Sequence, residues 1–353
     1  MEMSKKNLAV IGYGGQGGWH CQHALTSDVV NLKGIYDIKP ERNELARSRG
    51  IHAYGSLQEL LSDPTIDLVT IATPNDAHLE LVLAAFRAGK HVLCEKPAEM
   101  TVEAVQKMMD AANRAHKLFT VHQNRRFDVD YLAMRKILRD GCIGEPLRIE
   151  SRVHGSRGIP SDWRGTREHG GGMILDWGVH LIDQILQLIP DKVRSVYCRV
   201  THYTNEEVDD GFRIELEFES GVTAHIEIGT LNFIPMPRFY LQCRNGTAII
   251  QDWRQKAQVV RCKFWHENDV LPVQTAAGIT KTMAPRDEVT TDTFEIEKPE
   301  SDVHDFYRNY VAAIDGKETQ LVTHEQILRV MRVMTASFES AKTGLPVFFE
   351  GGL

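Results

Sequence analysis

Two groups of residues in this sequence have the types and spacing needed to polarise an oxygen atom and to move a proton. The first is the tripeptide Glu95-Lys96-Pro97, which directly follows an apolar run at 90–94. A lysine at the end of a buried strand lies where nucleotide-binding sheets place their ligands. Its ammonium group can hydrogen-bond an oxygen on which negative charge develops. Lys96 is therefore a candidate for stabilising an alkoxide.

The second group follows the glycine loop 170–172 and consists of Asp176, His180 and Asp183. Their spacing of i, i+4 and i+7 predicts that all three share one face of a helix over 175–188. A histidine can take a hydroxyl proton near neutral pH, and an aspartate can orient it. Asp183 could bind a neighbouring substrate hydroxyl. The pattern therefore predicts a proton relay.

Two other interpretations of this helix remain open. Asp176 and His180, one turn apart, could chelate a metal, but no third ligand is well placed and the Lys96 ammonium would oppose a cation, so we expect no metal. Alternatively, the two side chains only cap the glycine loop and satisfy each other.

A dinucleotide fingerprint opens the chain. The apolar strand 8–11 leads straight into Gly12-Tyr13-Gly14-Gly15-Gln16-Gly17. In this pattern the first glycine permits the tight turn, the second lets the backbone approach a pyrophosphate, and the third brings the helix close to the strand. The free N–H groups of the helix N-terminus then face the phosphates. Glycine loops also join strands and helices for structural reasons, so the flanking strand and helix carry the prediction.

Cofactor choice depends on the residues that follow the second strand, Asp37 and Ile38. Asp37 lies at the offset, about 20 residues beyond the glycines, at which a carboxylate binds ribose hydroxyls and repels a 2′-phosphate. NAD is therefore expected over NADP. Lys39 and Arg42 could accommodate a phosphate, and Asp37 could simply open the turn before Pro40.

Thr73-Pro74-Asn75 ends a third apolar strand, and His78 follows in the first turn of a helix. We expect these residues and Glu95 to line the cofactor crevice. A helix start needs a capping Thr or Asn in any case, so a structural role explains them nearly as well.

The elements expected around these residues define two domains. Strands at 8–11, 30–36, 68–72, 91–94 and 119–122 alternate with helices at 16–25, 40–49, 57–61, 77–88 and 101–115. This order predicts an α/β Rossmann domain over 1–125.

The order of the predicted elements changes after Arg125. A helix at 131–140 and a strand at 147–154 precede the glycine loop, and strands rich in β-branched residues follow at 193–202, 211–219, 222–231, 238–243 and 247–253. Ser220-Gly221 and Asn245-Gly246 read as hairpin turns. Residues 266–299 read as a surface loop, and helices at 301–315 and 323–342 close the chain. We predict a second α/β domain over 126–353 with a large, mostly antiparallel open sheet, its final helices packing back on the first domain.

Composition narrows the classes of molecule that the protein is expected to bind. The formal net charge is −7 without blocks of like charge, which disfavours nucleic acid and anionic membranes as partners. The six cysteines form no Cys-x-x-Cys pair, and no apolar run approaches the ~20 residues that span a bilayer. We expect a cytoplasmic protein with a small-molecule ligand.

Taken together, the motifs resemble the Gfo/Idh/MocA family (glucose–fructose oxidoreductase, inositol dehydrogenase and rhizopine-catabolism proteins) over essentially the whole chain. The motifs that carry the resemblance are Gly12-x-Gly14-x-x-Gly17, Ala72-Thr73-Pro74-Asn75-x-x-His78, the segment Ala88 to Pro97, and Gly170-Gly171-Gly172 leading to Asp176 and His180. The resemblance implies a catalytic Lys–Asp–His set at Lys96, Asp176 and His180. It also implies a cis bond before Pro97 and homo-oligomer contacts, as a dimer or tetramer, through the C-terminal sheet.

The residues predicted to bind substrate include two further segments that resemble elements of the family. They are Asn124-Arg125-Arg126, after the last strand of the first domain, and Trp163-Arg164, ahead of the glycine loop. An aromatic ring with several fixed donors suits a sugar or polyol, although arginines are usually just solvated.

Three functions follow as hypotheses. The first is an NAD-dependent dehydrogenase that oxidises a secondary hydroxyl of a sugar or cyclic polyol, such as an inositol, to a ketone. The second is a glycoside-cleaving enzyme in which NAD is reduced only transiently, which would release product without net NADH. The third is a non-catalytic sugar or nucleotide sensor, against which the intact Lys–Asp–His set argues.

Overall fold

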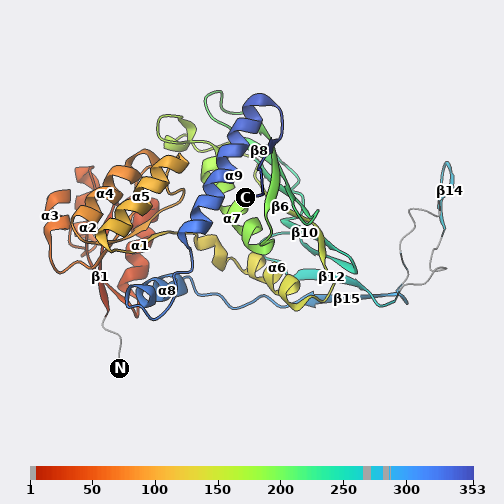
Figure 1. The fold of residues 1–353 in the computed structure, drawn as a ribbon, viewed down its shortest axis with the longest axis horizontal. Coiled ribbons are helices and arrows are strands. Elements are labelled where there is room, and N and C mark those ends of the chain that lie inside the picture. Colours follow the sequence, from red (N-terminus) through yellow and green to blue (C-terminus); the bar gives the residue numbers. More distant parts are fainter. Residues whose placement is uncertain (1–4, 265–271, 281–285, 287) are drawn as a thin grey trace.

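The computed structural model describes residues 5–264, 272–280, 286 and 288–353. It contains two large sheets, each with its own set of helices (Figure 1). Within the segment expected to be a surface loop, 266–271, 281–285 and 287 lie outside the described residues.

The first sheet is the parallel sheet that the sequence predicts. Its order is β2-β1-β3-β4-β5, so the chain reverses its direction of travel between β1 and β3. Ligands of such sheets bind outside the carboxyl ends of the strands at this reversal. The strands match the predicted ones to within two residues at either end: β1 (Lys6–Ile11), β2 (Val30–Tyr36), β3 (Leu68–Ile71), β4 (His91–Cys94) and β5 (Phe119–Val121).

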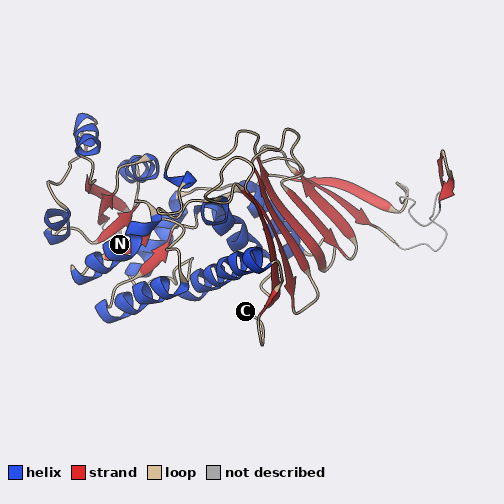
Figure 2. Cartoon of the chain, turned by 90° about the horizontal axis from the view of Figure 1, so that it is seen from above, coloured by secondary structure: helices blue, strands red, loops and turns tan. Residues whose placement is uncertain are grey.

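Helices cover this sheet on both faces (Figure 2), which explains why its central strand β3 is buried along its whole length: all four of its residues are buried. Thr101 caps α5 by accepting a hydrogen bond from Ala104 N at 3.2 Å. The helices are α1 (Gly15–Leu25), α2 (Pro40–Ser48), α3 (Leu57–Ser62), α4 (His78–Arg87) and α5 (Val102–Ala115).

The second sheet has nine strands in the order β15-β12-β11-β10-β6-β9-β8-β7-β16. Only the β6–β9 pair among its neighbouring strands is parallel. The strands are β6 (Pro146–His154), β7 (Val193–Thr201), β8 (Gly211–Phe218), β9 (Thr223–Gly229), β10 (Phe239–Cys243), β11 (Gly246–Ile250), β12 (Ala257–Cys262), β15 (Thr291–Ile296) and β16 (Val347–Phe348). A two-stranded hairpin, β13 (Val273–Thr275) with β14 (Gly278–Thr280), lies in the segment between β12 and β15.

Three strands at or next to the edges of this sheet depart from the prediction. Thr291–Ile296 was expected to be loop, but it forms β15, which pairs antiparallel with β12, and neither β12 nor β16 was anticipated. None of the residues of β15 is buried. An edge strand that buries so little has no alternation of apolar and polar residues to show in the sequence.

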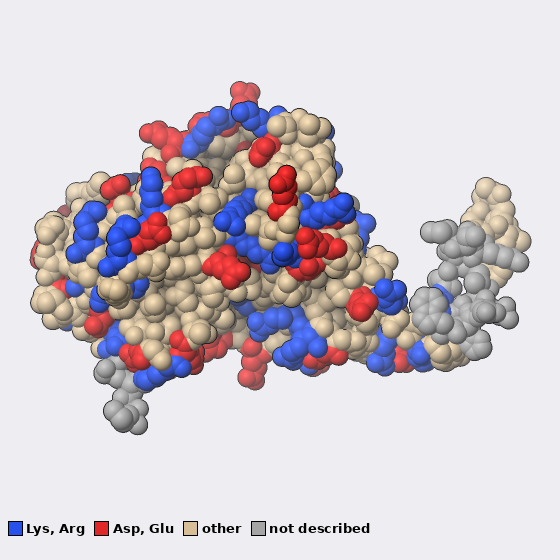
Figure 3. Space-filling view, in the orientation of Figure 1, with Lys and Arg blue, Asp and Glu red and all other residues tan. Residues whose placement is uncertain are grey.

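Helices lie on one face of the nine-stranded sheet, and none of the helices that the structure describes lies on the opposite face (Figure 2). The α-helices that follow β5 along the chain are α6 (Val129–Asp140), α7 (Val179–Leu188), α8 (His304–Ile314) and α9 (His324–Thr343). The contact between copies expected on the open face remains a prediction. Acidic and basic side chains are interspersed on the face of the molecule in Figure 3. None of the described helices is both long and apolar enough to cross a membrane.

The last two helices tie the domains together. In α8, the hydroxyl of Tyr310 donates to the carbonyls of Val92 and Leu118 at 2.8 and 2.9 Å, which fixes the helix against the first sheet. At the start of α9, Thr323 and Gln326 form a reciprocal capping box, and Gly344 ends the helix at φ 75°. The expected return of these helices to the first domain is thus seen for α8.

Candidate active site

The turn between β1 and α1 has the geometry of a pyrophosphate site. A Cβ on Gly12 would lie 2.4 Å from the carbonyl oxygen of Ala72, and one on Gly17 would lie 1.9 Å from that of Gly12, so only glycine fits at either position. A Cβ on Gly14 or Gly15 would meet nothing within 4 Å. No side chain caps α1, and its first turn has no acidic residue. Open space before free N–H groups therefore fits a phosphate.

Asp37 lies beside this turn, after β2. Its carboxylate accepts the backbone N–H of Tyr13 at 2.6 Å and that of Lys39 at 2.8 Å. These bonds aim the carboxylate at the glycine turn and hold Tyr13, whose side chain is buried. The neighbouring Ile38 is 85% exposed and offers an apolar surface beside the carboxylate.

The turn after β3 joins the two domains. The side-chain amide of Asn75 donates to the carbonyl of Gly170, in the glycine loop of the second domain, at 2.9 Å. His78 is fully buried, and its ring nitrogens lie 3.0 to 3.2 Å from the carbonyl oxygens of Thr73, Pro97 and Ala98. Asn75 and His78, predicted as cofactor contacts, thus hold the turn at 73–75 to the glycine loop and to the lysine segment.

Lys96 reaches across the domain boundary to the helix of the second domain. Its Nζ donates to the backbone oxygen of Asp176 at 2.8 Å and to Oδ1 of the same residue at 3.0 Å. The Lys96–Pro97 peptide bond is cis, as the resemblance implied. Burial disfavours the Asp176 carboxylate, but Lys96 and Arg164 outweigh it and lower the pKa of Asp176 below its ordinary value. Lys96 and Asp176 therefore form an ion pair at neutral pH.

The helix that carries these residues begins differently from the prediction. Ile174–Gly178 forms one π-helical turn, and the regular helix α7 starts only at Val179. A π turn inserts one residue and so rotates the side chains before it relative to the side chains after it. Asp176 and His180 therefore do not sit at ordinary i, i+4 positions. No hydrogen bond joins them among those of the described residues.

His180, at the start of α7, is buried and has a ring nitrogen without a hydrogen-bond partner among the described residues. It is 5% exposed, and its Nδ1 has no hydrogen-bond partner within the described part of the chain. Burial, then the charges of Lys96 and Arg125, lower the pKa of His180 well below its ordinary value. The imidazole is therefore neutral at pH 7 and can accept a proton.

Arg126 and Asp183, both predicted to contact substrate, contact each other instead. The Arg126 guanidinium donates through Nε and Nη2 to the two carboxylate oxygens of Asp183 at 2.8 and 2.6 Å, and both side chains are buried. Arg126 also donates to Leu321 O and Gln326 Oε1, near the start of α9. The pair links three segments of the fold and leaves no carboxylate oxygen of Asp183 free of Arg126.

This ion pair gives a first prediction. Asp183→Asn leaves the Arg126 charge buried without a counter-charge, which costs about 3–5 kcal/mol of unfolding free energy. Urea denaturation of the variant should show a loss of this size. Glu217→Gln, at an exposed ion pair with Arg194, is the control and should change stability by less than ~1 kcal/mol. Equal, small losses in both variants would contradict the structural role.

Arg125 and two tryptophans form a wall close to His180. The Arg125 guanidinium lies 4.2 Å from the Trp177 ring centroid and 5.6 Å from that of Trp253, and it pairs with Asp128 at 3.0 Å. The Trp177 and His180 rings are 6.1 Å apart. Asn124 contributes a buried side-chain oxygen that has no partner among the described residues. Arg125 therefore lies beside Trp177 and His180, and the contact of Asn124 and Arg125 with substrate stays a prediction.

Trp163 and Arg164 approach from the loop before the glycines. The Arg164 guanidinium lies 4.5 Å from the Trp163 ring, and its Nε is 3.4 Å from Oδ1 of Asp176. Arg164 also pairs with Asp162 at 2.8 Å. Oδ1 of Asp176 thus contacts both Lys96 and Arg164.

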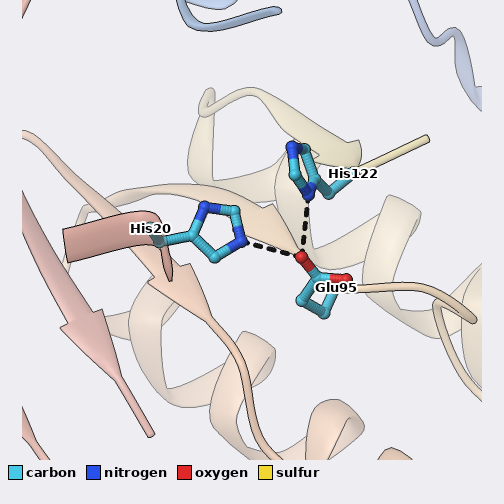
Figure 4. A group of neighbouring side chains, drawn as sticks. All are labelled: His20, Glu95 and His122. Carbon is cyan, nitrogen blue, oxygen red and sulfur yellow. Dashed lines mark hydrogen bonds and ion pairs between the residues drawn. The ribbon is translucent and has the colours of Figure 1, made fainter. Parts of the chain in front are cut away.

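Several residues at the site were not foreseen. Trp177 and Trp253 are two of them, and His20 and His122 are the others, both buried against Glu95 (Figure 4). His122 follows β5, at the carboxyl end of a parallel strand where ligands gather, and that position could have marked it. His20, on α1, and Trp253, after β11, reach the site only through the tertiary fold.

The chain matches known proteins along most of its length. Residues 6–123 match the model of the oxidoreductase family with an NAD-binding Rossmann fold, GFO_IDH_MocA, and residues 131–249 match the GFO/IDH/MocA C-terminal domain. A crystal structure of an NAD-binding protein from Listeria innocua is 42% identical, covers 98% of this chain and 100% of its own, and superposes with a TM-score of 0.95.

Relatives with named activities are more distant. Myo-inositol 2-dehydrogenase of Thermotoga maritima is 30% identical over 62% of this chain and 67% of its own. scyllo-Inositol 2-dehydrogenase (NADP(+)) IolW of Bacillus subtilis is 26% identical over 97% of this chain and 96% of its own. Two Schizosaccharomyces pombe oxidoreductases, 37% identical, are matched over only about half of their own length, 46% and 47%.

The fold and these matches agree. A parallel sheet with the glycine turn at its switch point is followed by a large, mostly antiparallel sheet, as in a solved relative that is aligned over its whole length. The chain belongs to the Gfo/Idh/MocA family of oxidoreductases with an NAD-binding Rossmann fold.

Proposed function

We propose that this protein is an NAD-dependent dehydrogenase that oxidises a secondary hydroxyl of a sugar or cyclic polyol to a ketone. One observation carries the proposal. Lys96 of the first domain hydrogen-bonds Asp176 of the second. His180, whose buried Nδ1 has no partner among the described residues, is on the same helical segment as Asp176. An oxygen-binding cation and a base without a partner in the described chain thus lie close together at the domain boundary.

The residues perform separate parts of the reaction. Lys96 donates a hydrogen bond to the substrate oxygen and stabilises its developing negative charge. His180 accepts the hydroxyl proton. Asp176 holds the Lys96 ammonium in place through the 3.0 Å contact. Bound NAD⁺ supplies the acceptor for the hydride that leaves the carbon, so the alcohol becomes a ketone and the cofactor becomes NADH.

The wall around the site supports the substrate class. Trp177 and Trp253 offer apolar ring faces, and Arg125 and Arg164 offer fixed donors. A sugar or cyclic polyol has apolar faces and a rim of hydroxyls, which such a wall matches. The inositol dehydrogenases among the relatives support the same class.

Asp37 supports NAD as the cofactor and gives a second prediction. Its carboxylate, fixed by Tyr13 N–H and Lys39 N–H beside the glycine turn, would repel a 2′-phosphate. Asp37→Asn should therefore raise the affinity for NADP relative to NAD by about tenfold, because one charge repulsion is removed. Calorimetric titration with each cofactor measures the ratio. Asp110→Asn, on the exposed side of α5, is the control, and an unchanged ratio in Asp37→Asn would contradict the assignment.

The proposed function is tested by a screen of NADH formation over inositols, aldoses, sugar acids and glycosides. We expect absorbance at the wavelength of NADH to rise with at least one polyol or sugar. Consumption of a glycoside without net NADH would show transient oxidation instead. Binding of sugars without any turnover would show a sensor.

A further inference from the structure

A buried carboxylate beside the lysine is held by two histidines. Oε1 of Glu95 lies 2.7 Å from Nε2 of His20 and 2.8 Å from Nδ1 of His122, and all three side chains are buried (Figure 4). His20 Nδ1 in turn lies 2.6 Å from the hydroxyl of Tyr307 on α8. Oε2 of Glu95 accepts the backbone N–H of Lys96 at 3.2 Å. The cluster thus adjoins the lysine that carries the chemistry.

Every N–H and O–H donor of this cluster has an acceptor when each imidazole carries a single N–H. Burial raises the pKa of Tyr307, so its phenol keeps the proton and donates to His20 Nδ1. Each histidine then donates its one N–H to Glu95. The other nitrogen of His122, Nε2, is buried without a partner among the described residues. A proton there would create a buried N–H without an acceptor, which is costly. The cluster therefore carries one negative charge, on Glu95.

That charge differs from the others at the site. Three cations there each have a carboxylate: Lys96 has Asp176, Arg125 has Asp128 and Arg126 has Asp183. Burial raises the pKa of Glu95, but the contacts with His122 and His20 outweigh it and keep the carboxylate ionised. Within the described chain, the carboxylate of Glu95 accepts hydrogen bonds from the two imidazoles and from one backbone N–H. A buried charge without a counter-charge is expensive and needs a reason.

The position of Glu95 supplies the reason. Glu95 follows β4 directly and precedes Lys96, and its charge is one of those that act on His180. Under the proposed function, the reacting carbon lies next to Lys96 and His180, and the nicotinamide ring must contact that carbon. The ring therefore lies in the field of Glu95. It is positively charged when oxidised and neutral when reduced.

We infer that Glu95, clamped by His20 and His122, is a built-in counter-charge that makes this site prefer oxidised over reduced nicotinamide. The inference rests on the proposed function for the placement of the ring, and it deepens that function by giving it a direction. A site that stabilises the cationic ring binds NAD⁺ more tightly relative to NADH. It therefore suits a dehydrogenase that loads NAD⁺ at low concentration and releases NADH readily.

Glu95→Gln tests the inference because it removes the charge and keeps the shape. Dissociation constants for NAD⁺ and NADH are measured by calorimetry without substrate. The ratio Kd(NADH)/Kd(NAD⁺) should fall by about tenfold in the variant, as one nearby charge is lost. Tyr307→Phe is the matched control, since it removes the outer hydrogen bond but leaves the carboxylate, and its ratio should stay at the wild-type value.

Three outcomes would overturn the inference. Equal loss of affinity for both cofactor forms in Glu95→Gln would show a purely structural role. A shift of the same size in Tyr307→Phe would show that packing, not charge, sets the ratio. The three ligand atoms lie within 4.8 Å of one another, so a stoichiometric metal in the purified protein, lost in His122→Phe, would make the cluster a metal site. Because no substrate is used, these results are independent of the polyol screen.

Discussion

Replacing Lys96 by Met should lower kcat/KM by about 10²–10³-fold while leaving NAD bound with unchanged affinity. The Lys96 ammonium is held at 2.8 and 3.0 Å by Asp176, and its hydrogen bonds within the described chain do not include the glycine turn. The loss should therefore fall on stabilisation of the alkoxide and not on cofactor binding. Initial rates of NADH formation and a calorimetric titration with NAD measure the two quantities.

Lys107→Met provides the matched control. Lys107 is exposed on α5, away from the ends of the strands, and loses the same charge on substitution. It should keep wild-type kcat/KM. If Lys96→Met turns over at the wild-type rate, or if it loses NAD binding in proportion to its rate, the proposed role of the lysine is contradicted.

Replacing His180 by Asn should lower kcat by about 10²–10⁴-fold at pH 7, because the proton acceptor is lost. The wild-type pH profile should carry the signature of this base. Its pKa is lowered by burial and by Lys96 and Arg125, so the imidazole is the free base throughout the range above its ordinary value of 6.5. Oxidation by the wild-type protein should therefore not slow as pH falls from 8 to about 6.5, and the acid limb should lie below that.

The variant should behave differently across the same range. Without a base, the hydroxyl proton must leave to solvent, so the residual rate of His180→Asn should rise with pH. His324→Asn is the control, since His324 lies at the start of α9 and contacts Phe119. A wild-type acid limb centred near neutral pH, or an unchanged profile in His180→Asn, would show that another group takes the proton.

The first domain was predictable because its signals are local. Apolar runs marked β1 to β5, and the turn at 12–17 has the glycines that its backbone contacts demand. Capping residues such as Thr101 and Thr323 marked helix starts. The edge strands β15 and β16, and β12 next to β15, were missed, since their pairing depends on distant partners and not on their own pattern.

The site was predictable in its residues but not in its pairings. Lys96 and Asp176 meet as expected, yet Asp183 turns to Arg126. The π turn at Ile174–Gly178 inserts one residue and so changes which side chains share a face of the helix. The i, i+4, i+7 spacing in the sequence cannot show this insertion. The Glu95 cluster joins α1, β4, β5 and α8, four segments whose proximity exists only in the folded chain.

The most direct test of the central claim follows a deuterium atom. A polyol found active in the screen is labelled at the reacting carbon and incubated with NAD⁺, and the reduced cofactor is analysed by mass spectrometry. The account predicts one deuterium in NADH for each ketone formed by the wild-type protein, and none above background with Lys96→Met/His180→Asn. If product forms without deuterated NADH, because the label stays in the product or passes to water, net hydride transfer at this site is contradicted.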